Sequence, residues 1–351
     1  MAVPATHNMK YRYLGNSGLL VSRLSFGSFV TFDGHFDINQ AYDIMIKAYQ
    51  GGVNFFDNAE GYGWGKSEQV MGEVIQHGIK NGVWTREDLV VSTKIFMGAK
   101  GMDAGPNDMG LNRKHIIEGT KASLKRFGFD YVDVIFCHRS EASTPTEEIV
   151  RAMNFVIEQG RALYWGTSEW TSHNIIEACE IADRLGLIRP IVEQPQYHIF
   201  ERSRVDFDYV NLYKKYKYGL TTWSPLAFGI LTGKYSNGIP EGTRLANVMV
   251  RGMMQTNLDE RIAKADKLKE IADELDCSLA QLTIAWRASN TNVSTVIIGA
   301  SSIRQLEENL KANEVIDKIT PEIKARIDEI AQFVPKVVEN DPYSYARTKW
   351  L

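Results

Sequence analysis

The chain has 351 residues, 44% hydrophobic and 24% charged, with a formal net charge of −3 and a pI of about 6.2. A basic excess that could neutralise phosphates is missing, so we expect no nucleic-acid binding. No apolar run approaches the ~18 residues that cross a bilayer, so we expect no membrane insertion. The three cysteines, Cys137, Cys179 and Cys277, are odd in number and widely spaced. This pattern fits neither a disulfide framework nor a zinc site, so we expect reduced thiols, no metal and a cytoplasmic location.

Strand and helix patterns alternate along most of the chain. Residues 1–9 are expected to be disordered, and residues 11–14 and 19–24 to form two short strands around the turn Asn16-Ser17-Gly18. The expected strands that follow are 24–28, 53–58, 89–94, 131–138, 162–168, 191–197, 220–226 and 295–301. The expected helices are 39–49, 67–77, 113–127, 144–159, 172–185, 206–218, 258–275, 279–288 and 303–311, before a C-terminal helix and tail over 312–351. For helix 144–159 we expect Thr144 as the cap, Pro145 at the first position and Glu147 completing a capping box.

Strict alternation of strands and helices predicts a parallel sheet. The eight strands from Leu24 onward favour an α/β fold closed into a (β/α)₈ TIM barrel, a single domain over residues 1–351 with the N-terminal β-hairpin closing the bottom. A doubly wound sheet would need a dinucleotide fingerprint, and Gly-x-Gly-x-x-Gly does not occur in the sequence. Gly65-Lys66-Ser67 resembles the end of a P-loop, but Glu60 stands where that loop needs glycine. We therefore expect neither kind of phosphate loop.

Ionisable residues end three consecutive predicted strands. Asp57 ends the second strand and is followed in the loop by Tyr62, Lys94 ends the third, and His138 ends the fourth. A TIM barrel places its chemistry at these carboxyl ends, so the four side chains are predicted to meet at one site. Taken singly, each could instead be a surface turn residue or, for His138, a core imidazole.

These four residue types suit acid catalysis by a phenol. Free tyrosine has a pKa near ~10, which is too high for an efficient proton donor at neutral pH. A neighbouring lysine ammonium lowers that pKa, and Asp57 keeps the buried Lys94 charged. His138 would orient the same substrate oxygen. The set predicts protonation of an alkoxide forming on a carbonyl carbon, with the hydride supplied by a nicotinamide cofactor.

The sequence resembles the aldo-keto reductase superfamily, most closely the branch that contains the β subunits of voltage-gated potassium channels. The similarity runs from about Tyr11 to about Asn309. The segments that carry it are Asn54–Tyr62, Ser92–Phe96, Arg113–Leu124, Tyr164–Ser168, Trp223–Ala227, Gly233–Tyr235 and Gly299–Ser301. The resemblance implies that Tyr62 is the proton donor and that Asp57, Lys94 and His138 complete a catalytic tetrad.

The resemblance also implies NADP(H) bound without a Rossmann domain. Ser168 and Gln194 would hold the carboxamide, and Trp223 would stack on the nicotinamide. The residues expected on the pyrophosphate and 2′-phosphate side are Ser224, Leu226, Lys234 and Arg244, and those at the adenosine end are Gly299, Ser301, Gln305, Glu308 and Asn309. Ser28, Phe29 and Asp57 complete the expected cofactor set.

Three positions depart from what the resemblance implies. Channel β subunits typically carry Asn where this chain has His138, so the full tetrad of the metabolic reductases is present here. Glu169 stands where that branch usually has Arg, which places a negative charge near the cofactor. Gln305 stands where many other reductases use Arg to hold the 2′-phosphate, which makes selectivity for the phosphorylated cofactor less secure.

The expected function is NADPH-dependent reduction of aldehydes or ketones, and the alternative is an auxiliary potassium channel subunit that uses a bound nucleotide as a redox sensor. Phe29, Trp64, Met97 and Trp170 are expected to line an apolar pocket for aromatic or medium-chain carbonyls, unless some of them pack loops. A homo-oligomer is possible, since channel-type relatives are often tetramers.

Overall fold

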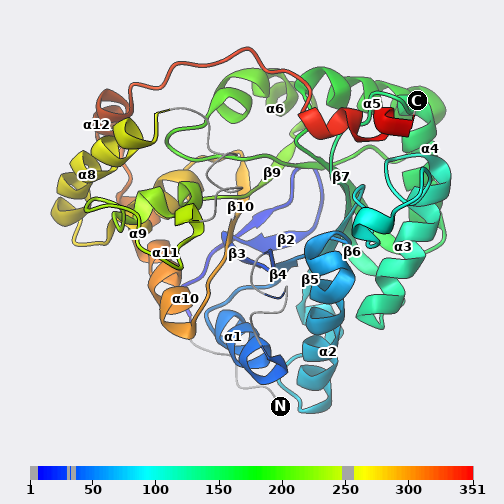
Figure 1. The fold of residues 1–351 in the computed structure, drawn as a ribbon, viewed down its shortest axis with the longest axis horizontal. Helices are drawn as coiled ribbons and strands as arrows, with labels where there is room; N and C mark the ends of the chain where they lie inside the picture. The colour runs from blue at the N-terminus through cyan, green and yellow to red at the C-terminus, as the bar shows by residue number, and fades with distance from the viewer. Residues whose placement is uncertain (1–6, 30–31, 33–36, 247–256, 351) are drawn as a thin grey trace.

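The computed structural model describes residues 7–29, 32, 37–246 and 257–350. Its centre is a closed parallel barrel in which the strands follow one another in the order β10-β3-β4-β5-β6-β7-β8-β9 (Figure 1). The barrel strands are β3 (Leu24–Gly27), β4 (Phe55–Asp57), β5 (Val90–Ile95), β6 (Val132–Cys137), β7 (Ala162–Ser168), β8 (Val192–Gln194), β9 (Gly219–Thr222) and β10 (Val293–Ile298). The predicted eight-stranded (β/α)₈ barrel is confirmed.

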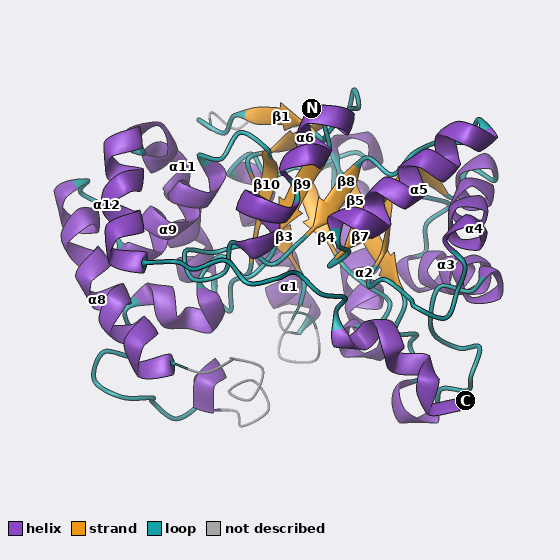
Figure 2. Cartoon of the chain, turned by 90° about the horizontal axis from the view of Figure 1, so that it is seen from above, coloured by secondary structure: helices purple, strands orange, loops and turns teal. Residues whose placement is uncertain are grey.

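Helices surround the barrel (Figures 1 and 2). They are α1 (Ile38–Gln50), α2 (Lys66–Lys80), α3 (Arg113–Phe127), α4 (Thr146–Glu158), α5 (Ser172–Leu185), α6 (Val210–Tyr216), α8 (Leu258–Glu274), α9 (Leu279–Ala288), α10 (Ile303–Leu310), α11 (Ala312–Val315) and α12 (Pro321–Ala331). After α12 the chain crosses the molecule (Figure 2) and ends in a 3₁₀ segment, Pro342–Trp350, next to the loop between β6 and α4.

The helix ends follow local sequence chemistry. Asn112 accepts a hydrogen bond from the backbone N–H of His115 and so caps α3. Gly128 ends the same helix with φ of 68°, a left-handed conformation that glycine adopts at little cost. The predicted capping box of α4 is wrong: the helix begins at Thr146 after Pro145, and the Thr144 hydroxyl instead donates to a carboxylate oxygen of Glu141. The predicted helix 206–218 is divided into a π-helical segment, Ser203–Asp208, and α6.

The N-terminal hairpin closes the amino end of the barrel. Strands β1 (Tyr11–Tyr13) and β2 (Leu20–Ser22) pair antiparallel, as predicted. Leu14 and Val21 are buried in one apolar cluster with barrel residues such as Phe55 and Val134. These residues fill the barrel interior at its amino end. The polar side chains of a site are therefore expected at the carboxyl end.

Disorder was predicted for residues 1–9, of which 1–6 lie outside the described residues. For the last part of this range the prediction is wrong. Met9 is buried in the core with 7% of its surface exposed, and the carbonyl of Asn8 accepts a hydrogen bond of 2.8 Å from Asn313 Nδ2. Apolar burial and this contact hold the segment against the barrel.

The described residues lack two features, a membrane-spanning helix and a metal-binding cluster. None of their helices is both long and apolar enough to cross a membrane. They also contain no group of three or more His, Cys, Asp or Glu side chains arranged to hold a metal ion.

Candidate active site

The four predicted catalytic residues come together at the carboxyl ends of β4, β5 and β6. Asp57 is the last residue of β4, Lys94 is the penultimate residue of β5, and His138 directly follows β6. Lys94 Nζ donates to Asp57 Oδ2 at 2.6 Å and to Tyr62 OH at 3.1 Å. Its third contact is the carbonyl of Asn58 at 2.7 Å. Since an ammonium has three donors, the fully buried Lys94 is satisfied by these groups alone.

The Asp57 carboxylate is held by groups from several strands. Ser92 Oγ and Gln194 Nε2 donate to Oδ1 at 2.8 and 3.0 Å, while Lys94 occupies Oδ2. Ser28 contributes through its backbone N–H and its hydroxyl, each 3.0 Å from the Asp57 carbonyl oxygen. The carboxylate is therefore a fixed anchor for the lysine rather than a mobile surface acid.

Aromatic rings enclose the phenol of Tyr62. The Phe29 ring centre lies 4.9 Å from that of Tyr62, and His138 meets the same ring edge-on at 5.8 Å. Desolvation by the surrounding protein raises the pKa of Tyr62, and Lys94 acts in the opposite direction. The expected sign of the lysine's effect is confirmed, but the expected net lowering of the phenol's pKa is wrong, because burial outweighs the lysine in the protein alone.

His138 is a neutral imidazole at neutral pH. Burial, Arg139 and Lys94 together hold the pKa of His138 well below its usual value, with burial the largest cause. Its Nδ1 is buried and has no hydrogen-bond partner among the described residues. A buried polar atom without a partner normally costs free energy, so this nitrogen suits a ligand group. Sequence reasoning missed Arg139, which donates to the carbonyl of His138 at 2.6 Å, and no sequence signal singles it out.

The residues expected around the nicotinamide lie at the neighbouring strand ends. Ser168, the last residue of β7, donates from Oγ to the carbonyl of Gln194 at 2.9 Å. Gln194 ends β8 and reaches Asp57, which links this group directly to the tetrad. Trp223 follows β9, is partly buried, and donates from Nε1 to Glu169 Oε1 at 2.8 Å. Ser224 follows with φ of 58°.

The residues expected at the adenosine end also form one group, between β10 and α10. Gln305 Oε1 accepts from the backbone N–H and the hydroxyl of Ser301 at 2.9 and 2.7 Å. Asn309 Nδ2 donates to the carbonyl of Gly299 at 3.3 Å. Glu308 accepts from Gln281 Nε2 on α9 at 2.9 Å. Gly299 is exposed, and a Cβ built on it would have no neighbour within 4 Å.

The expected phosphate-side residues are less closely grouped. Leu226 packs against the core, while Lys234 is exposed with its Nζ 5.1 Å from the Tyr235 ring centre. Arg244 begins a short 3₁₀ segment, Arg244–Ala246, and its side chain lies outside the described residues.

The expected substrate pocket residues divide into two kinds. Phe29 and Trp64 are 53% and 62% exposed, and Met97 is partly buried against Gly61. Trp170 is different: it is 2% exposed and packed in the main hydrophobic core. This burial favours the alternative of a packing role for Trp170, and its assignment to the substrate pocket stays a prediction.

Glu60, which sequence analysis considered only as a mismatch to a P-loop, has a structural role in the loop after β4. It is 1% exposed, and its Oε1 accepts from the backbone N–H groups of Phe96 and Gly98 at 2.7 and 2.9 Å. His115 Nε2 on α3 lies 3.0 Å from the same oxygen. Glu60 thus ties the Tyr62 loop to the end of β5. Its position between Asp57 and Tyr62 was the one available signal.

Comparison with known proteins assigns the family. The model of the aldo/keto reductase family matches residues 23–332, which is most of the chain. The chain belongs to the aldo/keto reductase family. Proteins of this family generally bind nicotinamide nucleotide cofactors, and the family supports an oxidoreductase.

This aldo/keto reductase is similar to curated proteins over nearly their whole length. It is 52% identical to the "Probable voltage-gated potassium channel subunit beta" of Arabidopsis thaliana over 334 residues, which is 95% of this chain and 99% of the relative. It is 50% identical to the rice protein of the same name, with the same coverage. It is 45% identical to the "Putative voltage-gated potassium channel subunit beta" of Schizosaccharomyces pombe, over 97% of this chain and 99% of the relative.

Proposed function

We propose that the protein is a cytoplasmic NADPH-dependent reductase of aldehydes or ketones. The observation that carries this proposal is the position of Lys94 Nζ, which contacts both Asp57 and Tyr62 at the carboxyl end of the barrel. The position suits a lysine that tunes a phenolic acid. The family assignment supports the same chemistry.

The residues present fit a nicotinamide nucleotide. His138 offers a buried, unpartnered Nδ1, and Gln194 Oε1 receives no hydrogen bond from any described residue, which leaves it open to a carboxamide N–H. Trp223 follows β9, the strand next to the one that Gln194 ends, and is partly exposed. When bound, the nicotinamide would supply the hydride that no amino acid side chain can provide.

The chain's own residues perform the proton transfer. Tyr62 donates its phenolic proton to the alkoxide oxygen that develops on the substrate carbonyl. Lys94 stabilises the phenolate left behind through its 3.1 Å contact, and Asp57 balances the lysine charge. Neutral His138 orients the substrate oxygen by a hydrogen bond. Phe29, Trp64 and Met97 form the apolar surroundings of that oxygen in this proposal.

Preference for NADPH over NADH is part of the proposal. The 2′-phosphate needs a cation, and Lys234 and Arg244 are the basic residues proposed for it. Ser224 and Leu226 are proposed beside the pyrophosphate, and the group around Gly299 and Asn309 at the adenosine end. The exposure of Lys234 and the open side of Gly299 support this arrangement.

Titration of the purified protein tests the proposal. NADPH and NADH are added separately while protein fluorescence is recorded, and NADPH consumption is then followed with a panel of aromatic and medium-chain carbonyls such as 4-nitrobenzaldehyde. Saturable NADPH binding followed by carbonyl-dependent oxidation is expected. NADPH binding without turnover of any carbonyl would contradict the proposed reductase activity and would favour the second candidate function described below.

The second candidate is an auxiliary channel subunit, and the names of relatives at 45–52% identity favour it. In this candidate the barrel docks on a channel and the bound nucleotide reports redox state. Affinity capture of a voltage-gated potassium channel from the same organism tests docking, with Tyr62→Phe as the matched variant. Light scattering of the purified chain tests the proposed homo-oligomer, for which a tetramer is the expected form.

A further inference from the structure

Trp223 is held by hydrogen bonds at both its indole ring and its backbone carbonyl. Its Nε1 donates to Glu169 Oε1 at 2.8 Å. Its carbonyl accepts from the guanidinium of the fully buried Arg287 at 2.5 Å. Stacking alone explains neither contact, because a ring can stack in several rotamers and tilts. These two hydrogen bonds therefore hold the Trp223 indole in one orientation without a bound ligand.

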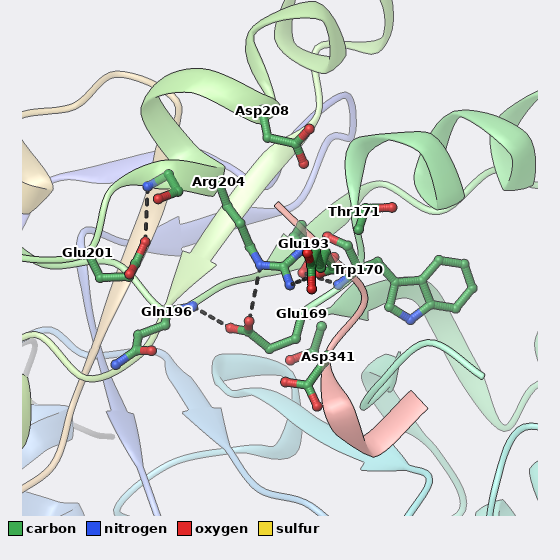
Figure 3. Close-up of polar contacts among 12 residues, drawn as sticks. Glu169, Trp170, Thr171, Glu193, Gln196, Glu201, Arg204, Asp208 and Asp341 are labelled. Carbon is green, nitrogen blue, oxygen red and sulfur yellow. Dashed lines mark hydrogen bonds and ion pairs between the residues drawn. The ribbon is translucent and has the colours of Figure 1, made fainter. Parts of the chain in front are cut away.

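Glu169 is built to be rigid. It directly follows Ser168 at the end of β7 and has φ of 57°, a left-handed conformation that a residue with a Cβ adopts only at a cost. Its side chain is 9% exposed. The same Oε1 that accepts from Trp223 also accepts a hydrogen bond of 2.5 Å from the backbone N–H of Gln196. Figure 3 draws the contact between Gln196 and Glu169. Glu169 Oε1 thus connects Glu169, Gln196 and Trp223, which lie after the successive barrel strands β7, β8 and β9.

Arg204 fixes the other oxygen of Glu169. Its Nε lies 3.3 Å from Glu169 Oε2, and Figure 3 draws this contact. The Arg204 side chain is 13% exposed. The remaining guanidinium nitrogens donate to the carbonyls of Trp170 at 2.8 Å and Glu339 at 3.3 Å. The pKa of Arg204 is raised above its already high value, because neighbouring Tyr209, Glu169 and Glu193 outweigh its burial. The arginine is therefore permanently charged and holds the carboxylate in one place.

We propose that Glu169 is a positioning residue that fixes the plane of the Trp223 indole for stacking against the nicotinamide, with Arg204 holding Glu169 in turn. The inference rests on the proposed nucleotide binding and adds a residue to it. Fixing the ring in advance lowers the entropy lost on binding, so affinity gained by stacking depends on the hydrogen bond to Glu169. Glu169 acts on the cofactor only through Trp223.

A double-mutant cycle separates this role from a merely structural one. NADPH dissociation constants are measured for the parent, Glu169→Ala, Trp223→Phe and the double variant, since phenylalanine lacks the indole N–H. Each single change is expected to weaken NADPH binding by roughly 5–50-fold, and the double variant to bind about as weakly as Trp223→Phe alone. Glu201→Ala is the matched control. Glu201 and Glu169 both line a cavity of about 210 Å³, but Glu201 accepts from the backbone N–H of Ser203 rather than from Trp223. Glu201→Ala should bind NADPH like the parent.

The conservative variant Glu169→Gln keeps an oxygen for the indole but loses the ion pair with Arg204. Its loss of NADPH affinity should therefore be smaller than that of Glu169→Ala, and this variant keeps the test open if Glu169→Ala fails to fold. Without nucleotide, the ¹⁵N–¹H signal of the Trp223 indole, assigned by its loss in Trp223→Phe, should shift in Glu169→Ala and not in Glu201→Ala. If the losses of NADPH affinity multiply in the double variant and the indole signal does not move, the role of Glu169 is overturned while the proposed function stands. A parent that binds neither NADPH nor NADH would overturn the proposed function as well.

Discussion

The ammonium of Lys94 lies 3.1 Å from the hydroxyl of Tyr62. The two groups cannot separate easily, because Lys94 is also bound to Asp57 and to the carbonyl of Asn58. Burial raises the pKa of the phenol and the lysine opposes that rise. Lys94 is the largest of the charges that act on the acid strength of Tyr62, with smaller effects from Asp57 and Arg139. Changes at Lys94 and at Tyr62 therefore have separable consequences.

Replacing Tyr62 by Phe should abolish most turnover and spare nucleotide binding. The substitution removes the proton donor but keeps the ring that packs beside Phe29. Turnover should fall by the ~10²–10⁴ typical of a lost general acid. Steady-state kinetics and NADPH titration on the same preparation check this. A Tyr62→Phe protein that reduces aldehydes at the parent rate would show that another group is the acid.

Lys94→Met should lower both turnover and stability. Methionine removes the charge that opposes the rise in the phenol's pKa, so Tyr62 becomes a still weaker proton donor and turnover should fall across the neutral pH range. The free energy of unfolding should fall by about 3–5 kcal/mol, since Asp57 is left as an unpaired buried carboxylate. Urea denaturation followed by circular dichroism measures the loss.

The double variant Asp57→Asn/Lys94→Met is the control for the lysine experiment. It removes both charges together, so it should recover a substantial part of the stability without recovering turnover. If its unfolding free energy were as low as that of Lys94→Met, the loss would come from packing rather than from an unpaired charge.

The fold could be predicted because its signals are local. Strand and helix periodicity, glycine stops and the strand-end positions of Asp57, Lys94 and His138 all lie within short windows of sequence, and parallel strands then bring their ends together. The meeting of Lys94 with Asp57 and Tyr62 was expected on this basis, and the structure shows it.

The parts that could not be predicted depend on partners far away in the chain. Glu60 looks like a turn residue until Phe96 and Gly98, more than thirty residues later, are seen to donate to it. Thr144 has the sequence of a helix cap, but its hydroxyl donates to the nearby Glu141. That carboxylate is held in place by the backbone N–H of Leu111 and by Arg347, both distant in the chain. Trp170 is an aromatic residue after a strand end, and only tertiary packing decides that it faces the core. Hydrophobicity cannot distinguish a pocket wall from a buried layer.

Cofactor choice can be tested at Arg244, which is proposed to lie near the 2′-phosphate. Arg244→Ala should weaken NADPH binding by roughly 1–3 kcal/mol, the scale of a lost charge-assisted contact, and leave NADH binding nearly unchanged. Fluorescence titration with both nucleotides measures the difference. Lys234→Ala is the companion variant at the other proposed cation. Equal losses for NADPH and NADH would show that neither residue reads the 2′-phosphate.

Glu193 should make the stability of the protein fall as pH rises above neutrality. Its fully buried carboxyl accepts from the backbone N–H of Trp170 at 3.1 Å, and from the hydroxyl of Thr167 on its other oxygen. Burial, with Glu169 adding to it, raises the pKa of Glu193 to about 8 from its usual 4.5. Between pH 4.5 and about pH 8 the folded state therefore keeps the Glu193 carboxyl protonated, whereas the unfolded state has lost that proton. The stability that this proton provides is complete below pH 4.5 and is lost as pH rises through about 8.

Glu193→Gln keeps a neutral side chain of the same shape and has no proton to lose. Its free energy of unfolding should fall less than that of the parent between about pH 7 and pH 9, a window chosen because the buried histidines titrate below it. Urea unfolding at several pH values gives the two curves, and Glu241→Gln, at an exposed position, is the control that should follow the parent. Parallel curves for the parent and Glu193→Gln would show that Glu193 is already ionised at neutral pH, and that Thr167 and Trp170 stabilise its charged form.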